Sequence, residues 1–196
     1  MNDRGYVGPP SGRLRVMRNG SSIVRTAAVP KPVVIVDSRE QQPFQFIPDH
    51  RNWIGGERRL ALKTGDYSIE GMESLLSLER KSLADIVACT VTYRKRFLAS
   101  CARLAKFRWK GILIEATFED IKSGFEQFDI PSDVHPNAVT GTLDAIEAKF
   151  GIPIIYTSTI RQLAAERAAS WLSKHFTYWW LETHQLGRVL IDDDKL

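Results

Sequence analysis

From Val33 onward, short β-branched apolar runs alternate with longer segments that carry apolar residues at helical spacing. The short runs predict buried strands, and the longer segments predict helices with one buried face. The predicted buried strands are Val33–Val36, Gly111–Glu115 and Ile152–Tyr156. The predicted helices are Ser82–Cys89, Tyr93–Phe107, Phe118–Ser123, Pro136–Phe150 and a long segment from about Ile160. This alternation predicts an α/β domain in which helices flank a mixed central β-sheet.

Residues at the ends of these helices support the predicted boundaries. Ser82 can cap the first helix, and Asp85 would then lie in its first turn. Pro136 suits the first turn of a later helix, and Gly151 suits the position just after that helix ends. We therefore expect the helices to begin and end close to these residues.

A hairpin that turns at Gly71 is predicted between the first buried strand and the first helix. Residues Gly65–Ile69 form a turn that enters the first strand, with Asp66 just inside it, and Leu75–Lys81 is the returning strand. Paired strands lie about 5 Å apart, so Asp66 and Glu79 could reach one ion. Residues two apart in a strand face the same way, which places Lys81 beside Glu79 and turns Arg80 away.

These charged side chains suit the hydrolysis of a phosphodiester bond. That reaction uses a metal ion to neutralise the phosphate and to activate a water molecule. Mg²⁺ prefers carboxylate oxygens, and a nearby cation stabilises developing negative charge. An isolated Glu79–Lys81 pair would suggest only a solvated surface contact. Together with Asp37 at the end of the first strand and with Asp66, the pair predicts a site for Mg²⁺, or for Mn²⁺ as its substitute.

Three segments, in this order, resemble the signature of the XPF-type nuclease family. They are Val36–Glu40, Gly65–Tyr67 and Glu79–Asp85. The signature is Gly-Asp, a spacer, Glu-Arg-Lys, three residues and Asp, and the family belongs to the PD-(D/E)XK nuclease group. The resemblance spans roughly residues 33–176. It implies a restriction-endonuclease-like core and a divalent-metal-dependent DNA endonuclease that acts on branched, flapped or forked DNA in repair, recombination or replication.

The resemblance also implies a role for each acidic residue of the signature and for its lysine. Asp66 and Glu79 would bind the metal ion directly. Lys81 would orient the attacking water and stabilise the charge of the transition state. Asp37 and Glu40 would complete the acidic cluster, with Asp37 as a further metal ligand, either direct or through a water molecule.

Three more residues of the signature gain roles from the same resemblance. Arg39 and Arg80 would contact the phosphate or brace the acids. Asp85 would support the site from the following helix, through Arg80 or Lys81. Taken alone, Asp85 is equally typical of an acid in the first turn of a helix.

A basic stretch runs from Tyr93 to Lys110, where seven Lys and Arg residues occur without any acidic residue. The whole chain has a formal net charge of +4. Arg96 and Arg103, seven residues apart, would share one helix face. Such a stretch indicates contact with the phosphates of DNA, although a solvated helix face has the same composition. The resemblance implies that Arg94 and Arg96 hold DNA phosphates.

Hydrophobic residues make up 43% of the chain, which is typical of a globular protein. The sequence contains no apolar run of the roughly 18 residues that a membrane span needs, so we expect no membrane partner. Cys89 and Cys101 lie in predicted helices and form no CxxC pair, which favours packing over a zinc site. A reducing setting is expected, in the cytoplasm or at the nucleoid, or in the host cytoplasm if the chain is phage-encoded.

We expect three regions in the chain. Residues 1–30 would form a disordered basic arm, either a solvated tail or a DNA contact. Residues 31–180 would form the nuclease domain, and residues 181–196 a C-terminal tail. The end of the last helix is rich in aromatic residues that suit either the core or a dimer surface. They are Trp171, Phe176, Tyr178, Trp179 and Trp180. The resemblance favours a homodimer that forms through the last helices.

Two functions are compatible with these observations. The first is an active endonuclease, and the second is a non-catalytic DNA-binding partner subunit that scaffolds another nuclease. Inactive relatives tend to lose the acids or the lysine, whereas Asp66, Glu79 and Lys81 are all present here. Relatives often carry a helicase-like region or a tandem helix-hairpin-helix module. Neither is recognised in this sequence, so a separate DNA-binding or helicase partner could supply it.

Overall fold

The structure, a computed structural model, describes residues 14–18, 21–25, 29–130, 133–184 and 188–189. Within this part of the chain, six strands form a central sheet in the order β4-β3-β5-β6-β7-β8. These strands are β3 (Val33–Asp37), β4 (Gly56–Leu60), β5 (Tyr67–Ile69), β6 (Leu76–Ser82), β7 (Trp109–Glu115) and β8 (Ile154–Tyr156). Antiparallel pairs join β5 to β3 and β6, while the other neighbouring strands are parallel. The sheet is mixed, as the sequence predicted.

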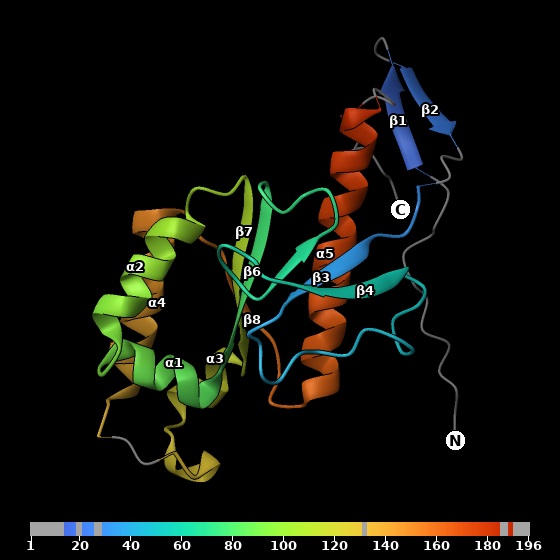
Figure 1. Cartoon of the computed structure of the whole chain (residues 1–196). Coiled ribbons are helices and arrows are strands. Elements are labelled where there is room, and N and C mark those ends of the chain that lie inside the picture. The colour runs from blue at the N-terminus through green and yellow to red at the C-terminus, as the bar shows by residue number, and fades with distance from the viewer. Residues whose placement is uncertain (1–13, 19–20, 26–28, 131–132, 185–187, 190–196) are drawn as a thin grey trace.

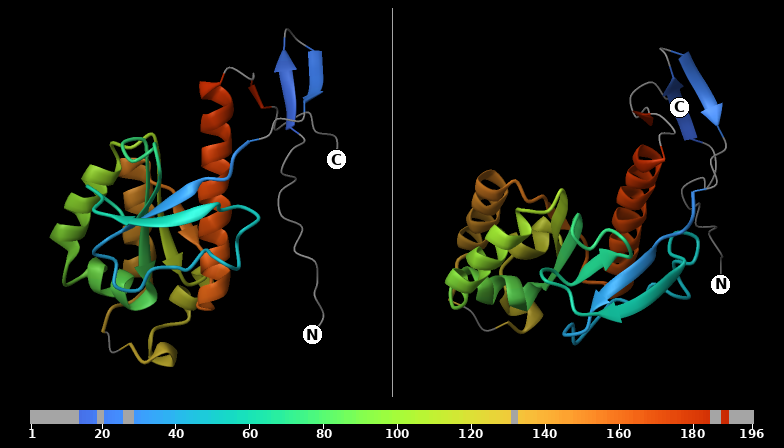
Figure 2. Two further views of the ribbon diagram at one scale, coloured as in Figure 1. Left: turned by 45° about the vertical axis from the view of Figure 1, so that its right-hand side comes forward. Right: turned by 45° about the horizontal axis from the view of Figure 1, so that its top comes forward.

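Helices cover both faces of this sheet, which confirms the predicted fold class. They are α1 (Leu83–Thr90), α2 (Arg94–Leu104), α3 (Phe118–Lys122), α4 (Pro136–Phe150) and α5 (Arg161–Thr183). A short 3₁₀ turn, Glu126–Phe128, lies between α3 and α4. Figures 1 and 2 show α1, α2 and α4 on one side of the sheet and the long α5 on the other. Helix α1 follows β6 directly, because Leu83 comes right after Ser82, the last residue of the strand.

The predicted helix ends agree with the structure. The Ser82 side chain accepts a hydrogen bond from the Asp85 amide at 3.1 Å and caps α1. Pro136 opens α4, whose end is marked by Gly151 in the left-handed region at φ 59°. The Gly151 amide donates to the Glu147 carbonyl at 2.9 Å. Local chemistry therefore sets the length of these helices.

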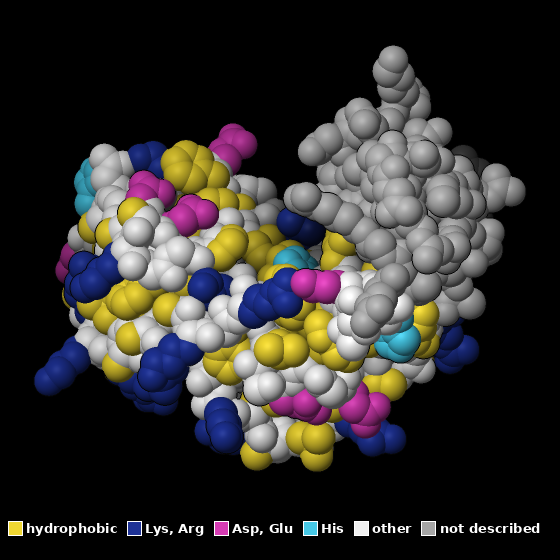
Figure 3. Space-filling model, turned by 90° about the horizontal axis from the view of Figure 1, so that it is seen from above, with side chains coloured by type: hydrophobic (Ala, Val, Ile, Leu, Met, Phe, Trp, Pro, Cys, Tyr) yellow, Lys and Arg dark blue, Asp and Glu magenta, His cyan; other side chains and the backbone are white. Residues whose placement is uncertain are grey.

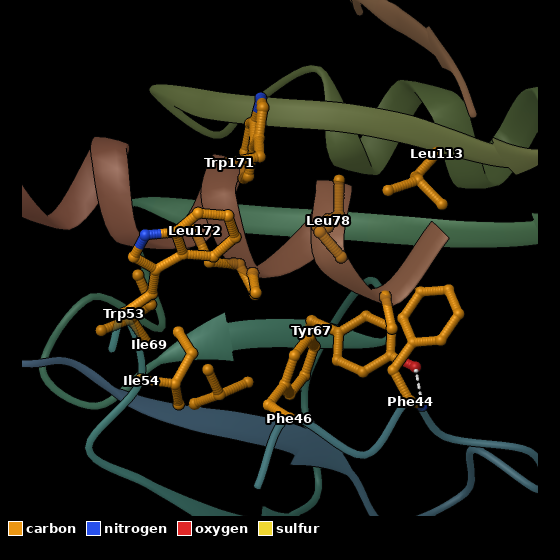
Figure 4. Packing of buried hydrophobic residues seen from close by; sticks show 14 of the residues in the cluster. Phe44, Phe46, Trp53, Ile54, Tyr67, Ile69, Leu78, Leu113, Trp171 and Leu172 are labelled. Atoms are coloured by element: carbon orange, nitrogen blue, oxygen red, sulfur yellow. Dashed lines mark hydrogen bonds between the residues drawn. The ribbon is translucent and has the colours of Figure 1, made fainter. Parts of the chain in front are cut away.

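One hydrophobic core lies between the sheet and α5 (Figure 4). Tyr67 of β5 is fully buried there, and its hydroxyl accepts a hydrogen bond from the Phe44 amide at 2.8 Å. Trp171 and Phe176 of α5 are buried in the same core, whereas Tyr178 is 38% exposed. The aromatic end of α5 is thus divided between the core and the surface.

A second core lies on the opposite face, beneath α1, α2 and α4. Phe97, Cys101 and Leu104 of α2 are buried in it, which confirms the apolar face predicted for this helix. Cys89 of α1 is only half-buried. Burial raises the pKa of both thiols, so neither is activated as a nucleophile.

The N-terminal segment contains more regular structure than the sequence predicted. Strands β1 (Leu14–Arg18) and β2 (Ser21–Arg25) pair in antiparallel register inside the segment expected to be a disordered arm. A third strand, β9 (Arg188–Val189), pairs with β1 and lies in the predicted C-terminal tail. This small sheet lies beyond the C-terminal end of α5 (Figure 1). The remaining residues of the arm and the tail lie outside the described part of the chain.

The surface seen from above combines Lys and Arg side chains with hydrophobic ones (Figure 3).

None of the helices in the described ranges combines the length and apolar character that crossing a membrane would require. Large hydrophobic side chains that are about half exposed include Leu60 at the end of β4 and Leu163 on α5.

Candidate active site

A polar hollow of about 640 Å³ opens at the C-terminal ends of β3 and β6, beside α2. It gathers nearly all the charged residues that the sequence indicated. Those lining it are Asp37, Arg39, Glu40, Asp66, Glu79, Arg80, Lys81, Asp85, Arg96 and Arg103. Arg94 lies elsewhere on α2, where its Nη1 donates to the Thr142 hydroxyl of α4 at 2.8 Å. The structure therefore separates Arg94 from the other predicted residues.

Asp66 lies one residue before β5, rather than within the strand as expected, and backbone contacts on both sides fix it. Its amide donates to the Leu78 carbonyl at 3.0 Å, and its carbonyl accepts from the Asp37 amide at 2.8 Å. The preceding Gly65 has φ +79°, and a Cβ there would lie 2.2 Å from the Ser77 hydroxyl. Only glycine fits this position, so the Gly-Asp pair is a geometric requirement of the site.

The Asp66 carboxylate faces Glu79 across the hairpin and accepts a hydrogen bond from the Arg80 amide at 2.7 Å. Burial, together with the negative charge of Glu79, raises the pKa of Asp66 to about 7. Two partly buried carboxylates that repel each other gain stability from a cation between them. This donor set therefore fits a hard divalent cation.

The Asp66 and Glu79 side chains are the oxygen donors of this candidate metal site. Among the described residues, no group of three or more His, Cys, Asp or Glu side chains is arranged to hold a metal ion. Mg²⁺ usually keeps several waters and takes only one or two protein carboxylates, alongside substrate phosphates. A pair of carboxylates open to a hollow is consistent with that preference.

Lys81 lies beside Glu79 on the same face of β6, as the spacing predicted. Its Nζ donates to the Glu79 carboxylate, and the two side chains are 17% and 13% exposed. Burial acts to lower the pKa of Lys81, but the Glu79 carboxylate outweighs it and the net shift is upward. Lys81 is consequently a cation at neutral pH, held at the edge of the hollow.

Asp37 accepts hydrogen bonds on both of its carboxylate oxygens. Oδ1 accepts from the Arg39 amide at 2.7 Å and from Arg39 Nε at 2.9 Å. Oδ2 accepts from Arg39 Nη2 and from the Leu62 amide, both at 2.8 Å. The hydrogen bonds from Arg39 lower the pKa of Asp37 to about 2, against the opposing effect of burial. Asp37 thereby anchors the loop that leads to Asp66.

The Arg80 side chain is directed away from the Glu79–Lys81 face, as predicted, and enters a buried ion-pair network. Its Nε donates to the Glu115 carboxylate at the end of β7, and its Nη1 lies 3.5 Å from Glu40 Oε1. The side chain is 7% exposed. Because the same residue holds Asp66 through its amide, this network fixes the backbone under the candidate metal site.

Glu115 and Arg161 belong to this network but were not singled out from the sequence. Arg161, at the start of α5, lies 3.2 Å from both Glu115 oxygens and donates to the Pro43 carbonyl at 3.0 Å. Its guanidinium and that of Arg80 both lie over the Phe44 ring, at 5.0 and 5.5 Å. A charged residue that ends an apolar strand was an available signal for Glu115. The sequence carried no signal for the pairing of Glu115 with Arg161, because 46 residues separate them.

The face of α2 towards the hollow carries Arg96, Ser100 and Arg103 at helical spacing. Arg96 and Arg103 thus share a face, as the sequence predicted. Asp85 also borders the hollow, and its carboxylate accepts from the Ser82 hydroxyl at 2.7 Å. Among the described residues, no ion pair joins Asp85 to Arg80 or Lys81, so its contact is a helix cap rather than the expected support.

Comparisons with known proteins agree with this fold. The profile of the ERCC4 domain family matches residues 22–166, a range that begins inside the predicted arm. XPF from Aeropyrum pernix is similar in structure, with a TM-score of 0.55, 19% identity, and coverage of 79% of this chain and 70% of that chain. XPF from Aeropyrum pernix in complex with DNA gives 0.54 and 19%, covering 79% and 74%. No curated protein sequence matches the chain.

Proposed function

Since this chain belongs to the ERCC4 domain family, we propose that it is a DNA endonuclease that hydrolyses phosphodiester bonds with the help of a divalent metal ion. The observation that carries the proposal is the convergence of Asp66, Glu79 and Lys81 in one polar hollow. The solved complex of XPF from Aeropyrum pernix with DNA supports DNA as the polymer that this fold handles.

Asp66 and Glu79 would hold the metal ion, which we propose to be Mg²⁺ with Mn²⁺ as its substitute. When bound, such an ion neutralises phosphate charge and lowers the pKa of a water molecule. The upward shift in the pKa of Asp66 supports this assignment, because burial and the negative charge of Glu79 make a bound cation favourable beside that carboxylate. Asp37, with both oxygens occupied, would position Asp66 through their backbone hydrogen bond.

Lys81 would act on the reacting phosphate and on the attacking water. Its Nζ is held by Glu79 and faces the hollow, so it can orient a water and donate to a phosphate oxygen. A preorganised cation stabilises charge that develops on that oxygen, without reorganisation during the reaction. Arg80, buried in its ion pairs with Glu40 and Glu115, would brace the backbone and would not contact substrate.

Arg96 and Arg103 would hold the DNA backbone at the rim of the hollow. Both are exposed, and they lie one above the other on α2, facing the candidate metal site. Phosphate contacts of this kind position the nucleic acid without reading its sequence. Arg39, whose side chain is 71% exposed while it holds Asp37, is a further candidate for this contact.

We further propose that the substrate is branched, flapped or forked DNA in repair, recombination or replication. The chain would act as a homodimer through α5, whose Tyr178 is exposed beside partly buried Trp179 and Trp180. A separate DNA-binding or helicase partner could add selectivity for a particular structure. We expect these events in the cytoplasm or at the nucleoid.

A cleavage assay on a panel of labelled DNAs tests the proposal. The panel holds single-strand, duplex, splayed-arm, flap, fork and four-way junction substrates, each with Mg²⁺, Mn²⁺ or EDTA. Glu79→Ala serves as the inactive control, because it removes a proposed metal ligand from a partly exposed position. Metal-dependent cutting that the control lacks would support the endonuclease. Binding without cutting on every substrate would favour the non-catalytic partner subunit.

A further inference from the structure

A second groove, of about 560 Å³, adjoins the catalytic hollow. The two share Lys63, Thr64 and Arg103 among their lining residues, so they form one continuous depression. One wall is the loop 60–64, which joins β4 to Asp66, and the other is the end of α2 with the residues that follow it. A polymer that lies in this groove would therefore continue into the catalytic hollow.

The groove combines an apolar base with a cationic rim. Leu60 is 50% exposed and Phe107 is half-buried, which presents hydrophobic surface to the groove. Lys63, Arg103 and Lys106 are exposed around it, and Glu73 is the single acid among its lining residues. The rim consequently attracts a polyanion, whereas the base favours apolar or aromatic faces.

We propose that this groove binds an unpaired DNA strand and leads it to the catalytic hollow, an inference that rests on the proposed function. Proteins hold single strands by placing bases against apolar or aromatic side chains and phosphates against cations. A duplex stacks its bases inside and offers none to Leu60 or Phe107, so we expect it to stay outside the groove. The enzyme would thus select DNA in which one strand near the cut is single.

The wall of the groove is tied to the candidate metal site, which links binding to catalysis. The Leu62 amide donates to Asp37 at 2.8 Å, and the Ser77 hydroxyl donates to the Thr64 carbonyl at 2.9 Å. These bonds hold the loop 60–64 against β3 and β6 and so fix the residues that precede Asp66. An unpaired strand on this loop would therefore reach the metal site along a fixed path.

The first test measures binding by the full chain to fluorescent oligo(dT) and to a blunt duplex, in EDTA so that nothing is cut. The double variant Lys63→Gln with Lys106→Gln removes two rim cations. We expect its affinity for oligo(dT) to fall about tenfold and the salt slope to lose roughly 1.4, because each single-strand phosphate contact contributes about 0.7. Duplex affinity should change less than about twofold, since a duplex that stays outside the groove does not contact Lys63 and Lys106.

A matched control removes two exposed lysines elsewhere, with Lys122→Gln on α3 and Lys149→Gln on α4. It has the same net charge as the first double variant, and we expect it to bind oligo(dT) as the wild type does. An equal loss in the control would mean that overall charge explains the effect, which would overturn the proposal. An unchanged affinity of the Lys63/Lys106 variant, or an equal loss for duplex, would also overturn it.

A second variant, Leu60→Ser, tests the apolar base separately. Leu60 is half-exposed, so the change leaves the core intact. Oligo(dT) affinity should fall several-fold while the salt slope stays the same, because no charge is altered. No loss of affinity would overturn the role of the base. These measurements need no cleavage, so they stay informative if the protein proves inactive. If the protein cuts DNA but the groove variants bind oligo(dT) as the wild type does, only this inference is overturned and the proposed function stands.

Discussion

Asp37 illustrates how one carboxylate can organise the residues around a site. It ends a buried strand, binds Arg39 and the Leu62 amide through its side chain, and holds Asp66 through the backbone. The position of Asp37 at the end of a strand predicted that it lies at the site. The strand-end pattern did not reveal that its side chain pairs with Arg39.

The ion pair of Asp37 makes stability depend on pH in a defined window. The pKa of Asp37 falls from 3.8 to about 2 in the folded protein. The contribution to stability is therefore complete above about pH 5, one unit above the unfolded pKa of 3.8, and is lost as the pH falls through about 2. Asp37→Asn should lower the free energy of unfolding at pH 7 by about 2 kcal/mol, as expected for hydrogen bonds to a charged group.

Urea unfolding of the wild type and of Asp37→Asn, from pH 7 to pH 2, measures this effect. The difference between the two proteins should stay constant down to about pH 5 and then shrink towards pH 2. Equal stability at pH 7, or a difference that grows in acid, would rule out the ion pair as its source.

Lys81 should contribute to the chemical step rather than to the binding of DNA. Lys81→Met keeps the aliphatic part of the side chain and removes its charge. We expect the single-turnover cleavage rate to fall by roughly 100-fold, as when one preorganised donor is lost from an active site. The dissociation constant for DNA, measured in EDTA, should stay within about threefold. A weaker affinity that accounts for the whole rate loss would instead make Lys81 a binding residue.

The core of the site was predictable because its geometry is local. A turn at Gly71 brings Asp66 opposite Glu79, and the period of a strand places Lys81 beside Glu79. The pairing of Glu115 with Arg161 joins two elements through the tertiary fold. The sequence around either residue therefore could not reveal it.

Among the elements, the strands and helices of the sheet domain follow the periodicity of the sequence closely. Their signals are strong because the strands are short buried runs, the helices carry one buried face, and caps or glycines mark helix ends, as at Ser82 and Gly151. Strands β1 and β2 were missed because they are short and lie in a segment rich in Gly, Ser and Arg. Backbone pairing with each other and with β9 defines them.

Helix α2 offers an internal comparison for DNA contact, because its arginines point in different directions. Arg96 lines the hollow, whereas Arg94 donates to Thr142 on α4. Arg96→Gln should weaken duplex binding and lower the slope of log affinity against log salt by roughly 0.9, the value for one phosphate contact. Titrations at several salt concentrations measure this slope, with Arg94→Gln as the control of equal charge. The same slope change in both variants would remove Arg96 from the contacting set.

At the scale of the whole molecule, the two layers of helices leave the C-terminal ends of β3 and β6 open, and the site lies there. Helix α5 serves the core with Trp171 and Phe176 and supports the site with Arg161. An association through its exposed side would leave the hollow accessible. The fold thus allows α5 to contribute to the core, to hold the site in place through Arg161 and to form the proposed interface.

The proposed homodimer predicts a mass of twice 22.2 kDa in light scattering after size-exclusion chromatography. Tyr178→Glu places a charge on the exposed side of α5 and should shift the protein towards the monomer, since charges are depleted from interface cores. Wild-type protein that runs as a monomer at micromolar concentration would contradict the dimer. It would leave the proposed chemistry untouched.

The central claim is that Asp66 and Glu79 form a metal site at which DNA is cut. The most direct test is the cleavage rate of a forked DNA against Mg²⁺ concentration, for the wild type and Glu79→Gln. Glu119→Gln, an exposed acid on α3, is the matched control. We expect cutting that rises with Mg²⁺, vanishes in EDTA, persists in Glu119→Gln and is undetectable in Glu79→Gln. Cutting that survives in EDTA, or at the wild-type rate in Glu79→Gln, would contradict the assignment.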